Sequence, residues 1–131
     1  MDMAGIKTTL EYEVNASKKM LYPYLSTASG LAQWFADDVS IDEDKVFHII
    51  WDEDVHRARL VAHRTNSYVK FEFIDDLIED RPAYAEIKLE ENELTQSVFL
   101  RITDYSDMED SEEVQELWDN LIHDLKEIVG G

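Results

Sequence analysis

The chain has 131 residues, a length that suits one domain with a single hydrophobic core, and 44% of them are hydrophobic. Its 12 basic and 30 acidic residues give a formal net charge of −18, which repels phosphate backbones and anionic bilayers. Nucleic acid is therefore excluded as a partner, and membrane insertion is not expected because no run of about eighteen apolar residues occurs. The absence of cysteine excludes disulfides and thiolate chemistry, and it fits a cytoplasmic location.

The first predicted element is a strand over residues 7–15, followed by a short helix. Every second residue of this segment lies on one side of an extended backbone, which is typical of a half-buried strand. That side carries Thr8, Leu10, Tyr12 and Val14. Ser17 is a good N-cap for the helix, and Pro23 must shorten or kink it, since a proline in a helix interior removes a hydrogen bond and clashes.

A second, brief helix is expected over residues 31–35. Ser29-Gly30 precedes the start of this helix, and Asp37-Asp38 ends it. Its apolar positions suit a helix with Leu31 or Trp34 turned inward. Together with the preceding helix it gives a short helical region between two strand-forming segments.

Six short strands are then predicted almost without a break. They are rich in β-branched and aromatic residues, and polar stretches that favour turns separate them, including an expected loop over residues 75–82. The predicted strands are residues 39–41, 46–51, 55–64, 68–74, 83–91 and 97–104. Apolar and charged residues alternate within them, so we predict an antiparallel meander with one dry and one wet face.

The last predicted element is a long amphipathic helix. Its apolar residues step by three and four and form one broad stripe: Val114, Leu117, Trp118, Leu121, Ile122, Leu125, Ile128 and Val129. Asp110 and Glu113 can form a capping box at its start, and Gly130 stands where a C-terminal glycine belongs. Acidic residues precede the helix and Lys126 lies near its end, the order that the helix dipole favours. The stripe must pack on the dry face of the sheet.

This element order, an α+β arrangement, resembles the helix-grip fold of the START and Bet v 1-like (SRPBCC) superfamily. Residues 29–38 (SGLAQWFADD) look like the segment that closes the helical region in START-like and Hsp90-ATPase-activator-like domains. Residues 117–125 (LWDNLIHDL) look like part of their last helix. The resemblance implies a single START-like domain over residues 1–131, with a strand, short helices and a six-stranded antiparallel meander curved around the C-terminal helix.

The resemblance further implies a cavity between the sheet and the last helix, which in many relatives holds a lipid, polyketide, hormone or other apolar molecule. The residues add an independent argument, because large flat side chains dominate the dry faces and aromatic rings line apolar pockets as readily as they fill cores. A solid core at near-crystal density is the alternative. The expected ligand-binding residues are Trp34, Phe47, Trp51, Phe71, Phe73, Trp118 and Ile122.

Catalytic, metal and cofactor motifs are not found in the sequence. The four histidines lack metal-binding spacing, and the four glycines cannot form a phosphate-binding loop, so we expect no metal and no cofactor. His48 and His56 could approach each other across a hairpin. An arginine that faced the cavity would favour an acidic head group.

Three functions follow, of which the leading one is non-enzymatic binding of a small hydrophobic ligand such as a lipid. The alternative is an Hsp90-activator-like protein-protein interaction module, in which acidic loops such as Asp37-Asp38 steer a basic protein partner. The third is proton-transfer chemistry inside the cavity, as in cyclases of the superfamily. Only Tyr12, Tyr84 and His48 are plausible groups for such chemistry.

Overall fold

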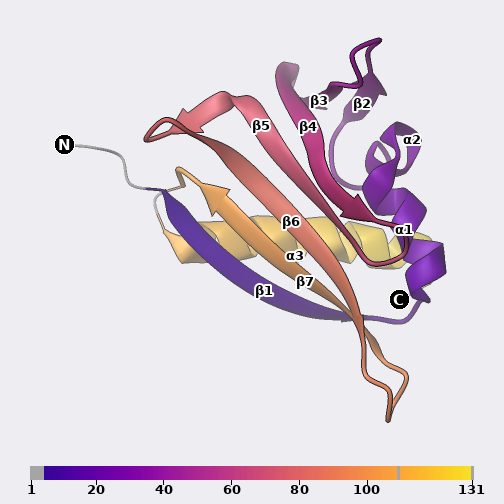
Figure 1. Ribbon diagram of the computed structural model, residues 1–131. Coiled ribbons are helices and arrows are strands. Elements are labelled where there is room, and N and C mark those ends of the chain that lie inside the picture. Colours follow the sequence, from indigo (N-terminus) through magenta and orange to yellow (C-terminus); the bar gives the residue numbers. More distant parts are fainter. Residues whose placement is uncertain (1–4, 109, 131) are drawn as a thin grey trace.

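Seven strands form one antiparallel sheet in the computed structural model, which describes residues 5–108 and 110–130 (Figure 1). The strands are β1 (Ile6–Val14), β2 (Asp38–Ile41), β3 (Phe47–Trp51), β4 (Asp54–Arg64), β5 (Tyr68–Ile78), β6 (Arg81–Glu91) and β7 (Val98–Ser106). Their order in space is β1-β7-β6-β5-β4-β3-β2, so the first strand pairs with the last and the others follow as a meander. The helices of the described residues are α1 (Lys18–Ser26), α2 (Ala28–Leu31) and α3 (Ser111–Val129).

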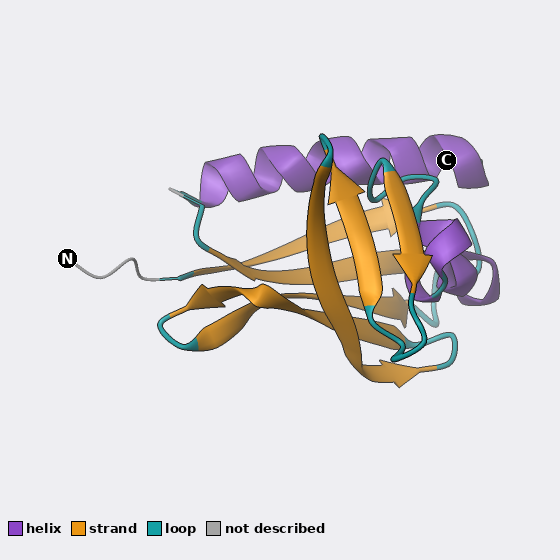
Figure 2. Ribbon diagram, turned by 90° about the horizontal axis from the view of Figure 1, so that it is seen from above, coloured by secondary structure: helices purple, strands orange, loops and turns teal. Residues whose placement is uncertain are grey.

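The sheet curves strongly, and α3 lies along its concave side. Figure 2 shows the long helix on one side of the strands, with the two short helices grouped near its C-terminal end. The described residues form no helix that has both the length and the apolar character to cross a membrane. The predicted α+β helix-grip fold, with a meander curved around a long C-terminal helix, is confirmed.

The predicted alternation of the strands and the predicted stripe of α3 meet in one core. On β6 the buried side chains are Ala83, Ala85, Ile87 and Leu89, and Tyr84, Glu86 and Lys88 stand between them. From α3 the core receives Val114, Trp118, Ile122, Leu125 and Val129. Asp110 Oδ1 accepts a 2.9 Å hydrogen bond from the backbone N–H of Glu113, and Gly130 ends the helix at φ 94°. Both predicted caps are therefore confirmed.

The predicted loop over residues 75–82 was wrong. Strands β5 and β6 run through this segment and are joined by a tight turn at Glu79 and Asp80, whose φ angles are 50° and 66°. Positive φ at both central residues is the geometry that matches the twist of a two-residue hairpin. The register shifts between Phe73 and Leu77, so a bulge stands where the loop was expected.

The second helix was also misplaced, since it spans Ala28–Leu31 rather than residues 31–35. The Thr27 hydroxyl caps it by accepting a 3.0 Å hydrogen bond from the Gly30 N–H. Leu31 and Trp34 are both buried, and Trp34 Nε1 donates to the carbonyl of Tyr24 at 2.8 Å. The preceding helix has nine residues with Pro23 inside it, so it is short, as predicted.

Candidate ligand-binding site

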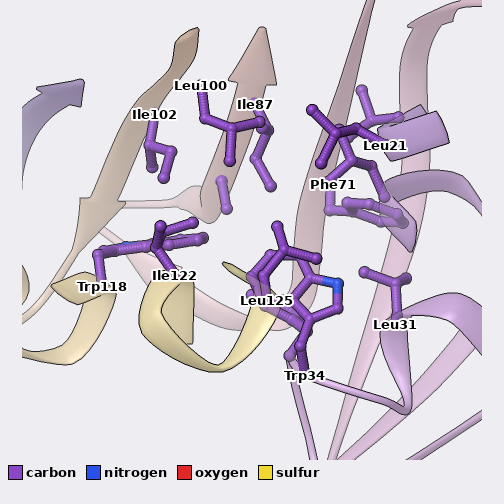
Figure 3. Close-up of a cluster of buried hydrophobic side chains, with 14 of the residues drawn as sticks. Leu21, Leu31, Trp34, Phe71, Ile87, Leu100, Ile102, Trp118, Ile122 and Leu125 are labelled. Carbon is purple, nitrogen blue, oxygen red and sulfur yellow. The ribbon is translucent and has the colours of Figure 1, made fainter. Parts of the chain in front are cut away.

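The concave face has two unlike ends, of which the first is solid. Around the C-terminal half of α3, side chains from the sheet and the short helices pack closely (Figure 3). We call this region the closed end and define it by Leu21, Leu25, Leu31, Trp34, Phe71 and Leu125, which are all at least 96% buried.

The second end contains a cavity of about 730 Å³, within the size range of small-molecule sites. It lies under the N-terminal half of α3, between that helix and the inner sides of β4 to β7. Its apolar lining comes from Phe35, Trp51, Phe73, Met108, Leu117, Trp118 and Leu121. We call this region the open end. Because Leu117 is exposed and Leu121 is only half buried, the apolar stripe of α3 reaches beyond the packed core here.

Three of the seven residues expected to bind ligand line this cavity, namely Trp51, Phe73 and Trp118. Trp51 Nε1 donates to the carbonyl of Phe35 at 2.6 Å, and the Phe35 ring lies 5.2 Å from Trp51 and 5.8 Å from Trp118. The aromatic walls are therefore held in place by one another. The other four expected residues are buried in the core and do not border the cavity: Trp34, Phe47, Phe71 and Ile122.

A buried carboxyl group forms part of the cavity lining. Asp104 on β7 is 9% exposed, and its Oδ2 accepts a 2.8 Å hydrogen bond from Trp118 Nε1. Burial raises the pKa of Asp104 above its ordinary value, and the hydrogen bond from Trp118 and the nearby hydroxyl of Ser106 offset part of this effect. Oδ1 of Asp104 and Oγ of Ser106 nevertheless have no partner at hydrogen-bond geometry.

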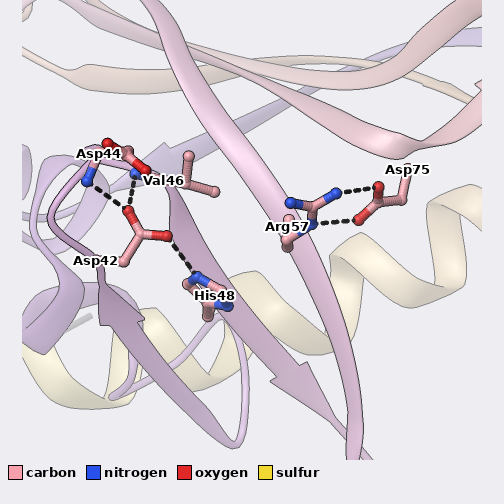
Figure 4. A network of polar contacts seen from close by, with 6 residues as sticks. All are labelled: Asp42, Asp44, Val46, His48, Arg57 and Asp75. Carbon is pink, nitrogen blue, oxygen red and sulfur yellow. Dashed lines mark hydrogen bonds and ion pairs between the residues drawn. The ribbon is translucent and has the colours of Figure 1, made fainter.

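The exposed part of the cavity lining is acidic. It includes Asp52, Asp75, Asp76 and Asp107. Arg57 holds Asp75 through two hydrogen bonds of 2.7 and 2.8 Å (Figure 4), and this guanidinium lowers the pKa of Asp75. His56 Nδ1 lies 3.1 Å from Asp76 Oδ2. No lysine or arginine of the described ranges lines the cavity, so the arginine that would favour an acidic head group is not there.

The residues considered for proton transfer lie in separate places. The Tyr12 hydroxyl donates to Asp119 on α3 at 2.6 Å, and burial together with this carboxylate raises the pKa of Tyr12. The ring of Tyr84 packs on that of Tyr105 at 5.6 Å. His48 Nε2 lies 2.9 Å from Asp42 Oδ2, which lowers the pKa of that carboxyl (Figure 4).

His48 and His56 do not meet across the hairpin. In the register of β3 and β4, His48 lies opposite Arg57, and His56 lies opposite Ile49. Because neighbouring positions of a strand face opposite sides, His48 lies with Asp42 while His56 packs on Trp51 in the cavity lining. Among residues 5–108 and 110–130, no three acidic or histidine side chains gather as a metal site.

Asp104 and Ser106 are polar cavity residues that the sequence analysis missed. The predicted strand ended at Asp104, and no role was predicted for either residue. A signal was present, because the alternation of Val98, Leu100 and Ile102 continues to Asp104 and Ser106. This alternation, extended past Ile102, places the carboxyl group of Asp104 and the hydroxyl group of Ser106 on the dry face.

A curved sheet that grips one long helix above an apolar cavity defines the helix-grip class of α+β domains. The START-like superfamily domain matches residues 3–131, and the chain belongs to this superfamily.

Solved structures agree with this assignment. The protein BfR322 from Bacteroides fragilis is 38% identical, with 95% of this chain and 91% of that chain aligned at a TM-score of 0.65. The Aha1 dimer from Colwellia psychrerythraea is 17% identical, with 95% of this chain and 96% of that chain aligned at a TM-score of 0.76. MLL2253 from Mesorhizobium loti is 13% identical, with 95% of this chain and 97% of that chain aligned at a TM-score of 0.75. The latter two show likeness of fold alone, and no curated protein sequence matches the chain significantly.

Proposed function

We propose that this protein binds a small hydrophobic molecule in the open end of its concave face and does not transform it. The observation that carries the proposal is the cavity of about 730 Å³ with an aromatic and aliphatic lining. Trp51, Phe73 and Trp118 are the proposed contact residues. The four expected residues that lie in the core support the cavity walls rather than touch the ligand.

Binding is favoured over catalysis because of the surroundings of Asp104. General acid-base chemistry needs a group that can pass its proton to a reacting atom or to a relay. The hydrogen bond that Asp104 accepts comes from the indole of Trp118, which does not titrate in the physiological range. Tyr12 and His48 do not border the cavity. Tyr84 does, but its ring packs on Tyr105 and lies 4.4 Å from Lys70 Nζ.

The test is saturable binding of an uncharged fluorescent probe, N-phenyl-1-naphthylamine, to the native protein. We expect one site per chain, and we expect Ala83→Leu to weaken binding several-fold because the larger side chain takes up cavity space. Ala83 is 9% exposed and lines the cavity. The matched control is Ala62→Leu, on the neighbouring part of the sheet but outside the cavity lining, which should leave the affinity unchanged.

Native mass spectrometry of gently purified protein gives a second readout that needs no variant. A discrete excess over the mass of the denatured chain, extractable into organic solvent, would support a bound ligand. Probe binding that appears only in partly unfolding conditions, or that Ala83→Leu and Ala62→Leu weaken equally, would overturn the proposal.

The alternative function is a protein-protein interaction module. The net charge of −18 and the fold likeness to the Aha1 dimer favour it. Long-range attraction between an acidic surface and a basic partner is screened by salt. This function therefore requires an association with a purified basic partner that weakens as the salt concentration rises. An association whose strength does not change with the salt concentration would count against it.

A further inference from the structure

Two residues of the cavity lining carry buried polar atoms without hydrogen-bond partners, and a third such atom lies on the neighbouring strand β1. Within the described residues, Oγ1 of Thr8, Oδ1 of Asp104 and Oγ of Ser106 are the buried side-chain atoms that lack a partner. Thr8 on β1 lies directly opposite Asp104 on β7, and Ser106 stands two residues further on the same strand. Unpaired buried polar groups are costly and therefore rare, so those in the cavity lining indicate a missing polar partner.

Asp104 is the charged member of this group and lies in the cavity lining. Its Oδ2 is taken by Trp118 Nε1 at 2.8 Å, while its Oδ1 remains without a partner. A carboxylate oxygen can only accept a hydrogen bond, so the group that completes it must be a donor. Burial raises the pKa of Asp104, and a neighbouring positive charge would favour its ionised form.

The charges around the cavity favour a positively charged donor group. Besides Asp104, four carboxylates line it, and no lysine or arginine of the described residues does. Those four are Asp52, Asp75, Asp76 and Asp107. Arg57 is paired with Asp75, and His56 lies beside Asp76. The charges that no basic side chain of the described residues offsets are those of Asp52, Asp107 and Asp104, and they attract a cation and repel an anionic head group.

The aromatic walls suit the same ligand. Phe35, Trp51 and Phe73 can bury an apolar body, and the face of Trp51 or Phe73 attracts a cation that passes over it. Building on the proposed function, we propose that the ligand is an amphiphilic amine, whose protonated N–H group donates to Asp104 Oδ1 and whose apolar body lies against these rings. Ser106, which also lines the cavity, supplies a further acceptor through its hydroxyl oxygen.

The test compares three probes of equal chain length by isothermal titration calorimetry at pH 7: octylammonium, octan-1-ol and octanoate. The alcohol reports the apolar cavity alone, and the two ions differ in the sign of the head group. We expect octylammonium to bind at least about tenfold more tightly than octanoate, because only the ammonium group can donate a charge-assisted hydrogen bond to Asp104.

Two variants separate Asp104 from the general charge of the protein. Asp104→Asn keeps an oxygen that can accept from Trp118 and removes the negative charge, so we expect it to abolish the preference for octylammonium. Asp124→Asn removes one charge from the exposed face of α3, outside the cavity lining, and should retain the preference. Near-UV circular dichroism of both variants checks that the tertiary packing is intact.

The outcomes distinguish the two proposals. If none of the three probes binds, the proposed function fails. If octan-1-ol binds but octylammonium binds no better than octanoate, the cavity is a ligand site and the amine inference is wrong. If Asp124→Asn lowers octylammonium binding as much as Asp104→Asn does, the attraction comes from net charge, and Asp104 is not the anchor.

Discussion

The closed end and the open end of the concave face are built from the same strands, yet one is solid and the other hollow. At the closed end, α1 and α2 lie over the sheet beside the C-terminal half of α3 (Figure 1). At the open end, α3 lies above the sheet without them. The strands alternate in the same way at both ends, so the covering helices decide which end becomes core.

This contrast also separates the two kinds of aromatic residue on the dry face. Phe47 and Phe71 pack edge to face at 5.1 Å and are at least 96% buried. Trp51 on β3 and Phe73 on β5 lie on either side of β4, and both remain partly exposed in the cavity. Residues of one chemical type therefore serve as packing at one end and as a candidate binding surface at the other.

The largest expected effect comes from truncating the same residue type at the two ends of α3. Leu125 is fully buried at the closed end, whereas Leu121, one turn earlier, is half buried and lines the cavity. We expect Leu125→Ala to lower the free energy of unfolding by about 3 kcal/mol and Leu121→Ala by about 1 kcal/mol, because only the first creates a closed void. Urea-induced unfolding measures both, and equal losses would mean that the two ends are packed alike.

A smaller effect is expected where α1 and α2 touch each other beside the closed end. A Cβ added at Gly30 would overlap the carbonyl oxygen of Pro23 and lie 2.7 Å from the Cα of Tyr24. We expect Gly30→Ala to destabilise the fold by about 2 kcal/mol in thermal or urea unfolding, since the backbone must shift to make room. Ser29→Ala, at the exposed neighbouring position, is the control and should leave stability nearly unchanged.

The smallest effect concerns the open end and depends on pH. Because the pKa of Asp104 is raised in the folded state, its ionisation opposes folding, and this penalty grows as the pH rises through the folded-state pKa. Asp104→Asn should therefore be more stable than the wild type at pH 7, with a gap that narrows as the pH falls toward the unfolded-state pKa of about 3.9. Urea unfolding at several pH values measures this gap. A constant gap, or a variant that is less stable at pH 7, would show that the carboxylate is well accommodated.

Most of the fold could be predicted because its elements are periodic. The stripe of α3 and the alternation of the strands depend on local geometry, which the order of residues records directly. The segment 75–82 could not be predicted in the same way. Asp75, Asp76, Asp80 and Pro82 are all turn-forming types, and pairing between β5 and β6 overrode that local preference.

The candidate site could be predicted only in part, for a different physical reason. Alternation reports which face of a strand a residue occupies, and it placed Trp51 and Phe71 alike on the dry face. It does not report which part of that face a helix will cover. Asp104 was within reach of the same rule, but the predicted strand ended there and the alternation was not followed further.

The pairing of β1 with β7 has a consequence for the order of folding. Thr8 and Asp104 lie near opposite ends of the sequence, and they become neighbours only when the first strand joins the last. Such non-local contacts form slowly compared with the hairpins of the meander. A chain that has folded its hairpins but has not yet joined its ends contains most of the sheet, and it leaves Asp104 and Ser106 on the unpaired edge of β7. Tight binding of an amine would then indicate that the whole sheet has formed. Collapse of the apolar core alone would not produce such binding.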